Sequence, residues 1–106
     1  MRNFEMISES FYRIPIYSLP EPGANLQMTV ETVELPFLKG GENGHNGIIT
    51  EDLLSALIDH LTKLNVGDLR NRETSVTITK LEEARMWLEE RKRNRKARGV
   101  FGTKKS

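Results

Sequence analysis

Apolar residues recur along this chain with two different periods, and the change between them falls near residue 47. Between residues 26 and 37 they alternate with polar residues in two successive phases, set by Leu26, Met28 and Val30 and then by Val33, Leu35 and Phe37. Such alternation predicts a β-strand, and the change of phase near residues 31–32 predicts a β-bulge. Beyond residue 50 the spacing becomes three and four residues, which predicts helices.

A second extended segment is predicted upstream, at residues 11–17, which are rich in aromatic and β-branched side chains. Pro15 lies inside this segment, and Pro36 lies near the end of the following one. Proline has no N–H to donate to a neighbouring strand, so we expect the first segment to be an edge strand or an extended arm and the second to lie at the edge of a sheet. Residues 20–25 have the composition of a turn. The pattern predicts an antiparallel β-hairpin or small sheet over about residues 10–38.

The first predicted helix follows a glycine-rich loop at residues 39–47. We expect this helix to begin near Thr50 as its N-cap and to end at Gly67. Glu51 and Asp52 suit the positive end of the helix dipole. The apolar stripe that should face the core consists of Leu54, Leu57, Ile58, Leu61 and Leu64.

The second predicted helix begins near Asn71, runs to about Ala97 and stops at Gly99. Because the connection at residues 66–70 is short, the two helices should be antiparallel. At about 1.5 Å per residue, the roughly 27 residues of the second helix span about 40 Å, whereas the first helix has only about 15 residues. The far third of the second helix is therefore not covered by the first. Its stripe of Ile78, Leu81, Ala84 and Leu88 is continued there by Arg91 and Arg95.

The expected fold class is α+β: an N-terminal antiparallel β-hairpin or small sheet followed by an antiparallel two-helix hairpin. Residues 1–46 hold the β-segment and the glycine-rich loop, and residues 47–106 hold the helical hairpin and a basic tail. Only 37% of the 106 residues are hydrophobic, so assembly into oligomers is a plausible source of additional core. The lack of cysteine suits a reducing cytosol, and no apolar run approaches the roughly 20 residues that cross a bilayer.

Charge is distributed unevenly, although the net charge is only +1. Residues 91–106 contain eight of the 16 lysines and arginines and no acid, whereas the rest of the chain is net acidic. This asymmetry favours local binding of an anion over a uniformly basic nucleic-acid binder. Arg91 and Arg95 are four residues apart, so their guanidinium groups can reach the same phosphate. The alternative to an anion-binding site is a solvated helix end whose positive charges interact favourably with the helix dipole.

Catalytic chemistry finds little support in the sequence. His45 and His60 lack metal-ligand spacing, so no metal and no cofactor are expected. No nucleophile elbow or phosphate-binding glycine loop occurs. The adjacent carboxylates at residues 82–83 and 89–90 point apart on a helix and cannot form an acid–base pair. A nucleic acid remains possible, with Trp87 stacking on bases, although we interpret Trp87 as a core residue first.

The strings HNG (residues 45–47), TEDLLSALID (50–59), TKLEEA (79–84), MWL (86–88) and RGVFGT (98–103), together with Arg91 and Arg95, closely resemble a bacteriophage family. It is the anti-defence sponge family that opposes the Thoeris and CBASS immune systems. The resemblance covers about residues 37–103. It implies a non-enzymatic protein that sequesters cyclic nucleotide second messengers in the host bacterial cytoplasm. Cyclic ADP-ribose isomers are the first candidates, and cyclic di- and trinucleotides are further ones.

The resemblance also implies self-assembly, from dimer to hexamer, with pockets between subunits. The family's phosphate-binding arginines fall on Arg91 and Arg95, its polar contact on Thr74 and its aromatic contact on Leu64. The last two depart from the family pattern, since an asparagine and an aromatic residue are usual there. Further candidate ligand contacts are Arg72 and Arg98. The alternative function is that of a small phage nucleic-acid-binding or structural scaffold protein.

Overall fold

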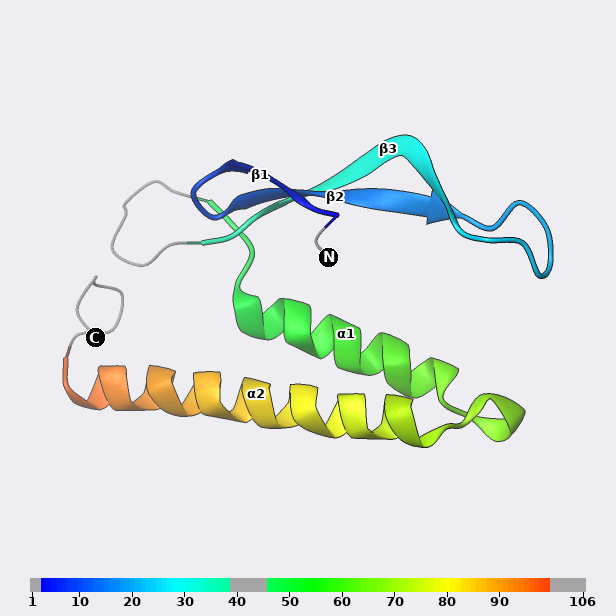
Figure 1. Cartoon of the computed structure of the whole chain (residues 1–106). Coiled ribbons are helices and arrows are strands. Elements are labelled where there is room, and N and C mark those ends of the chain that lie inside the picture. Colours follow the sequence, from blue (N-terminus) through cyan, green and yellow to red (C-terminus); the bar gives the residue numbers. More distant parts are fainter. Residues whose placement is uncertain (1–2, 39–45, 100–106) are drawn as a thin grey trace. The chain divides into compact units, whose positions relative to one another are not determined.

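The computed structural model describes residues 3–38 and 46–99 of the 106-residue chain. They divide into two compact units, with the strands in the first and the helices in the second (Figure 1). Among the described residues the first unit ends at Ile48 and the second begins at Ile49. The predicted α+β class is confirmed, because an antiparallel sheet precedes two helices. Most of the loop predicted at residues 39–47 lies outside the described residues.

The sheet has three antiparallel strands in the spatial order β1-β2-β3: β1 (Glu5–Ser8), β2 (Phe11–Ser18) and β3 (Gln27–Pro36). The expectation that residues 11–17 form an edge strand is wrong for the first part of β2, because β1 pairs with residues 11–13. β3 is an edge strand of the three-stranded sheet, as predicted, but its end is covered locally, because the carbonyl of Pro36 accepts a hydrogen bond from the N–H of Ile48 at 2.7 Å and Phe37 forms an isolated parallel bridge with Ile48.

Pro15 fits into β2 because its missing N–H falls on the side away from β3. The carbonyl of Ser10 accepts a hydrogen bond at 2.7 Å from the N–H of Phe37, the residue after β3. The carbonyl of Ile16 accepts one at 2.9 Å from the hydroxyl of Thr29 in β3. Backbone groups of even-numbered residues therefore face β3, and those of odd-numbered residues face the other side. On that side the pairing with β1 ends at Arg13. Pro15 thus interrupts no ladder hydrogen bond.

The predicted bulge is present in β3. Pro15 pairs with Thr32 and Tyr17 pairs with Met28, so three residues of β3 lie opposite one residue of β2. The Thr29 hydroxyl holds this irregularity, since it donates to the carbonyl of Ile16 at 2.9 Å and accepts from its own strand. Because the insertion adds two residues, it does not reverse the alternation, and the two apolar phases, represented by Met28 and Val33, lie on opposite faces of the sheet.

Side chains on the sheet explain why the short strand β1 pairs with β2. Arg13 lies in register with Glu5 on one side and Glu34 on the other, with N–O distances of 3.5 and 3.6 Å. Tyr12 makes edge-to-face contacts with Phe4 and Phe37, at centroid distances of 5.5 and 5.9 Å. Because exposed ion pairs contribute little, the aromatic row supplies most of the stabilisation.

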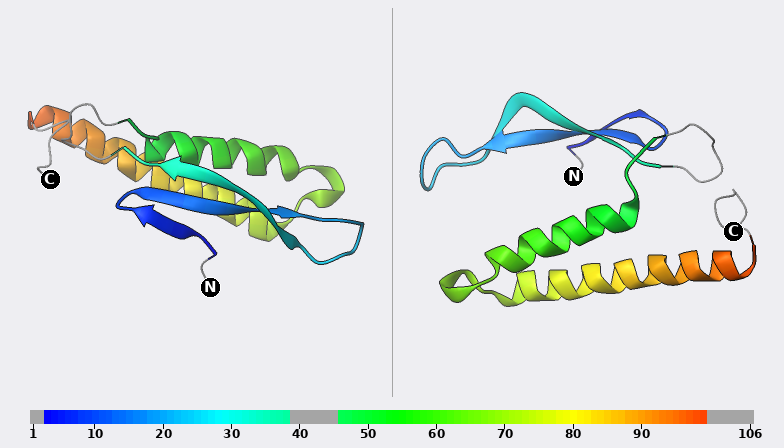
Figure 2. Two further views of the ribbon diagram at one scale, coloured as in Figure 1. Left: turned by 90° about the horizontal axis from the view of Figure 1, so that it is seen from above. Right: turned by 180° about the vertical axis from the view of Figure 1, so that it is seen from behind.

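The second unit consists of α1 (Thr50–Leu64), the single 3₁₀ turn η1 (Gly67–Leu69) and α2 (Arg72–Ala97). The helices lie side by side and antiparallel in both further views (Figure 2). The N-cap of α1 is Ile49 rather than Thr50, with extended dihedrals and no side-chain cap bond. Its carbonyl accepts from Asp52 and Leu53, so the helix begins one residue earlier than the capping preference indicated.

The α1–α2 hairpin has a thin core and a fixed register. Ile58 is its one buried apolar side chain among the described residues, at 9% exposure. Arg85 donates to the hydroxyl of Ser55 at 3.1 Å, and Asn65 donates to the hydroxyl of Ser75 at 2.9 Å. Ser55 and Asn65 are ten residues apart in the chain, and so are Ser75 and Arg85. The register is therefore constant along the hairpin. Neither helix combines the length and apolar character needed to cross a membrane.

Candidate anion-binding site

The C-terminal turns of α2 extend past the beginning of α1. With Ser55 opposite Arg85, the first residue of α1, Thr50, lies opposite Glu90. Residues 91–97 of α2 therefore continue for about 10 Å, at 1.5 Å per residue, without α1 beside them. The overhang is visible in Figure 1 and in the right-hand view of Figure 2. The uncovered end that the helix lengths predicted is thus present within the hairpin.

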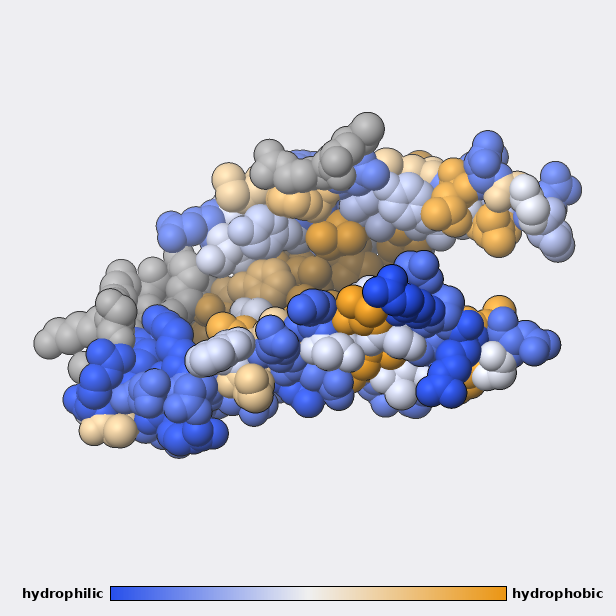
Figure 3. Space-filling view, turned by 60° about the horizontal axis from the view of Figure 1, so that its bottom comes forward, coloured by the Kyte–Doolittle hydropathy of each residue, from blue (hydrophilic) through white to orange (hydrophobic). Residues whose placement is uncertain are grey.

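The overhang is strongly cationic. Hydrophilic side chains gather at this end of α2 (Figure 3). Arg93 forms an ion pair with Glu90, one turn before it. Arg98 is the C-cap and donates from Nε to the carbonyl of Asn94 at 3.4 Å, and Gly99 then ends the helix with a φ of +74°. The basic residues of the overhang are Arg91, Lys92, Arg93, Arg95 and Lys96, and Arg98 follows directly as the C-cap.

Arg91 and Arg95 lie in different environments, although they are one turn apart. The Arg91 side chain is exposed, and its guanidinium makes no hydrogen bond or ion pair with any described residue. Arg95 is enclosed, at 9% exposure. An enclosed guanidinium keeps its orientation better than a solvated one, whereas an exposed one can swing onto a ligand. The pair combines one fixed group and one adaptable group.

The remaining candidate residues lie at the other end of the hairpin. Leu64 is the last residue of α1 and is 50% exposed. Arg72 and Thr74 lie in the first turn of α2, where the Thr74 amide donates to the side chain of Asn71 at 2.7 Å. From Thr74 to Arg91 the helix rises by roughly 25 Å. The candidates therefore form two groups in one protomer rather than one pocket.

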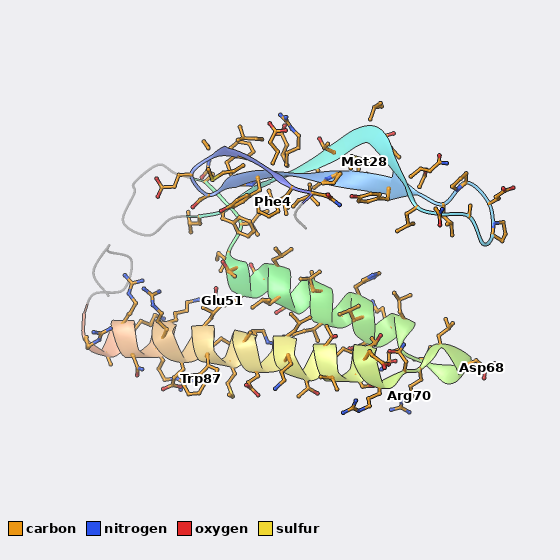
Figure 4. All side chains as sticks on the ribbon, viewed as in Figure 1. Phe4, Met28, Glu51, Asp68, Arg70 and Trp87 are labelled. Atoms are coloured by element: carbon orange, nitrogen blue, oxygen red, sulfur yellow. The ribbon has the colours of Figure 1, made fainter. Side chains whose placement is uncertain are left out.

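Three features of the hairpin were not predicted from the sequence. The side chain of Asn65 bonds to Asn71 and Ser75 and so closes the turn, and α1 ends at Leu64, before the expected stop at Gly67. Trp87 was expected in the core, but it is 64% exposed and its side chain lies on the side of α2 away from α1 (Figure 4). The core interpretation of Trp87 is thus wrong within the protomer.

The fold and its charge define a class: a small α+β protein with a helical hairpin whose longer helix carries a cationic overhang. The sequence model of the family described as "Acb2/Tad1, hairpin domain" matches residues 33–93, which is more than half of the chain. The chain belongs to this family, and the resemblance noted in the sequence is confirmed.

One relative extends this assignment. A protein of Bacillus phage SBSphiJ7, named "Thoeris anti-defense 1", is 45% identical over 62 residues, which cover 58% of this chain and 44% of that protein. The chain therefore matches less than half of the length of this relative. The family match includes Leu64, Thr74 and Arg91 and stops before Arg95.

Proposed function

We propose that this chain is a phage anti-defence protein that captures a cyclic nucleotide immune signal and holds it without cleaving it. Cyclic ADP-ribose isomers are the first candidates, and cyclic di- and trinucleotides are the next. Membership in the hairpin-domain family supports the proposal, as does the name of the Bacillus phage relative. The single observation that carries it is the cationic overhang, where an exposed Arg91 stands one turn from an enclosed Arg95.

The chemistry of the overhang suits a phosphodiester or diphosphate. A guanidinium presents a planar fork of donors that matches two phosphate oxygens, and charge-assisted bonds of this kind are about twice as strong as neutral ones. Both the guanidinium and a phosphodiester stay charged throughout the physiological pH range. Capture should therefore not depend on pH between about 6 and 8. No proton transfer is needed, because the ligand is held and not converted.

The separation of the candidate residues bears on how a pocket would be built. A cyclic dinucleotide-sized ligand cannot reach from Thr74 to Arg91 within one hairpin, since the helix rises by roughly 25 Å between them. We propose that the two groups meet across a subunit boundary, where one protomer supplies Arg91 and Arg95 and a neighbour supplies Leu64 and Thr74. Assembly to a dimer or a larger oligomer is then part of the mechanism. Arg72 and Arg98 would lie at the rims of the two groups.

Affinity would account for the whole effect of such a protein. A captured signal is unavailable to the host effector as long as the protein is in excess and binds more tightly than the effector does. The site of action would be the host bacterial cytoplasm, where the signal is produced. Leu64 and Thr74 offer neither an aromatic face nor a paired amide to the ligand, so the preferred messenger should differ from that of relatives that carry those groups.

A panel of ligands tests this proposal. Thermal shift is measured with cyclic ADP-ribose isomers, cyclic dinucleotides and cyclic trinucleotides, and the ligand is recovered after heat denaturation of the complex. We expect a rise in melting temperature with at least one of them and recovery of the intact compound. Recovery of a cleaved product would refute capture without turnover. No shift with any ligand, together with DNA binding that weakens steeply with salt, would instead support the scaffold or nucleic-acid alternative.

A further inference from the structure

The one tryptophan of the chain lies in an unusual place for so large an apolar side chain. Trp87 is 64% exposed and points away from α1, near the base of the cationic overhang (Figure 4). Full burial of a tryptophan is favourable, so exposure of most of its surface calls for a partner. Among the described residues, no aromatic contact involves Trp87.

The helix surface around Trp87 does not resemble an apolar seam for another helix. A seam needs apolar residues three and four positions away on each side. Here those positions are occupied by Glu83, Ala84, Glu90 and Arg91. Met86 is exposed as well, but adjacent residues of a helix diverge by about 100° and cannot share one narrow face. Three of the four nearest side chains on this helix surface are therefore charged, and the fourth is only alanine.

Charge changes sign across this indole. Glu83 lies one turn before Trp87 and Arg91 one turn after it, with about 5–6 Å between Cβ atoms at that spacing. Glu90 is engaged by Arg93. The guanidinium of Arg91 makes no such contact with any described residue. A ligand with a flat aromatic part and an anionic part would lie with its anion toward Arg91 and away from Glu83.

We infer that Trp87 is the base-contacting residue of the nucleotide site to which Arg91 belongs, and that its indole stacks on a nucleobase while Arg91 binds the neighbouring phosphate. This inference rests on the proposed function and specifies its ligand contacts. Stacking between an aromatic side chain and a base is favourable for every base, because each base has a π-face. Trp87 would contribute affinity for nucleotides as a class. It would supply the aromatic contact that Leu64 does not offer.

Binding of cyclic ADP-ribose by the full chain and three variants tests the inference. Trp87→Ala removes the ring, Trp87→Phe keeps a smaller ring, and Met86→Ala removes the neighbouring exposed side chain as a matched control. Affinity is measured by calorimetry. We expect Trp87→Ala to weaken binding roughly 10- to 100-fold, as loss of one base stack would do. Trp87→Phe should recover most of the loss, and Met86→Ala should change little.

Indole emission provides an independent readout, because Trp87 is the single tryptophan. Stacking should quench the emission of the wild-type chain in proportion to occupancy. Tight binding with unchanged emission and an unaffected Trp87→Ala would overturn the inference and leave the proposed function intact. A change of oligomer mass in Trp87→Ala, seen by light scattering, would overturn it too, since Trp87 would then be a subunit contact. If the wild-type chain binds no cyclic nucleotide, the proposed function fails and the inference with it.

Discussion

The side-chain oxygen of Asn65 accepts a hydrogen bond from the backbone N–H of Asn71, with 2.9 Å between the two atoms. Asn65 is the C-cap of α1 and Asn71 is the N-cap of α2, so this bond joins the ends of the two helices. The Asn65 amide also donates to the hydroxyl of Ser75 at 2.9 Å. One side chain thus fixes both the closure of the turn and the antiparallel register.

Replacing Asn65 with alanine should therefore destabilise the hairpin. The substitution removes two hydrogen bonds, that of the Asn71 N–H and that donated to the Ser75 hydroxyl, which still donates to the Asn71 carbonyl at 3.0 Å. The expected cost is about 1–3 kcal/mol in the free energy of unfolding. Urea denaturation followed by circular dichroism measures this loss. Thr62→Ala, at an exposed position of α1, is the control and should change the free energy by less than about 0.5 kcal/mol. Equal losses in the two variants would contradict the role assigned to Asn65.

A second prediction concerns the bulge of β3. Thr29→Val keeps the shape of the side chain but removes the hydroxyl that contacts the Ile16 carbonyl and the Glu31 N–H. We expect a loss of about 1–2 kcal/mol in the free energy of unfolding and faster amide exchange at Glu31. Thr32→Val is the matched control, because Thr32 is exposed on the same strand. Unaltered exchange at Glu31 would show that the backbone holds the bulge without Thr29.

Gly47 allows a third prediction. A Cβ atom there would lie 2.4 Å from the backbone nitrogen of Leu38 and 2.6 Å from the carbonyl carbon of Phe37, so alanine does not fit without movement of the backbone. The bonds at risk are Leu38 N–H to the Ile48 carbonyl and Ile48 N–H to the Pro36 carbonyl, at 3.0 and 2.7 Å. We expect Gly47→Ala to cost about 1–3 kcal/mol.

Amide hydrogen exchange shows which backbone hydrogen bonds the Gly47 substitution weakens. Leu38 and Ile48 should lose protection in Gly47→Ala. Gly23→Ala is the comparison, since Gly23 has a φ of +80° but open space around it, and alanine there suffers strain without a clash. Protection of Leu38 and Ile48 should survive in that variant. If both alanine variants leave it intact, the close approach at Gly47 is not structurally important.

The helices could be predicted because their signals are local. Asn71 accepts from Thr74, and Gly99 takes a positive φ, as the cap residues indicated. The strand β1 could not be predicted in this way. Residues 5–8 are short and exposed, and β1 depends on contacts such as that of Glu5 with Arg13, which is eight residues away. Non-local pairing of this kind leaves no period in the sequence.

The candidate site was predictable in part. The position of Arg91 beyond α1 follows from the lengths of the helices, and the distance from Thr74 follows from the helical rise. The contrast between exposed Arg91 and enclosed Arg95 does not follow, because continuation of one apolar stripe assigns both to the same face. The orientation of Trp87 could not be predicted either, because large apolar side chains of a helix usually face the core of the protein, whereas Trp87 is exposed.

A fourth prediction concerns pH. Lys63 donates from Nζ to Asp59 at 2.8 Å, and this hydrogen bond, followed by the charge attraction, raises the pKa of Lys63 above its usual 10.5. Since the pKa is higher in the folded state, the stabilisation is fully present below pH 10.5 and is lost as the pH rises through the raised value. Asp59→Asn should lower the pKa of Lys63, measured by NMR titration, and leave the stability profile between about pH 6 and 9 flat. Glu82→Gln, on α2, should leave that titration unchanged.

The final prediction separates a specific arginine fork from a general positive field. Arg91→Ala should weaken binding of cyclic ADP-ribose by more than about 1.5 kcal/mol, because a charge-assisted contact is lost. Arg93→Ala removes the same charge two residues away, but Arg93 is already paired with Glu90, so a loss within about 0.5 kcal/mol is expected. Arg91→Lys should fall between them, since an ammonium group keeps the charge without the planar fork. Calorimetry at two salt concentrations measures all three. Equal losses for Arg91→Ala and Arg93→Ala, both disappearing in high salt, would mean that the overhang attracts the ligand only through its total charge.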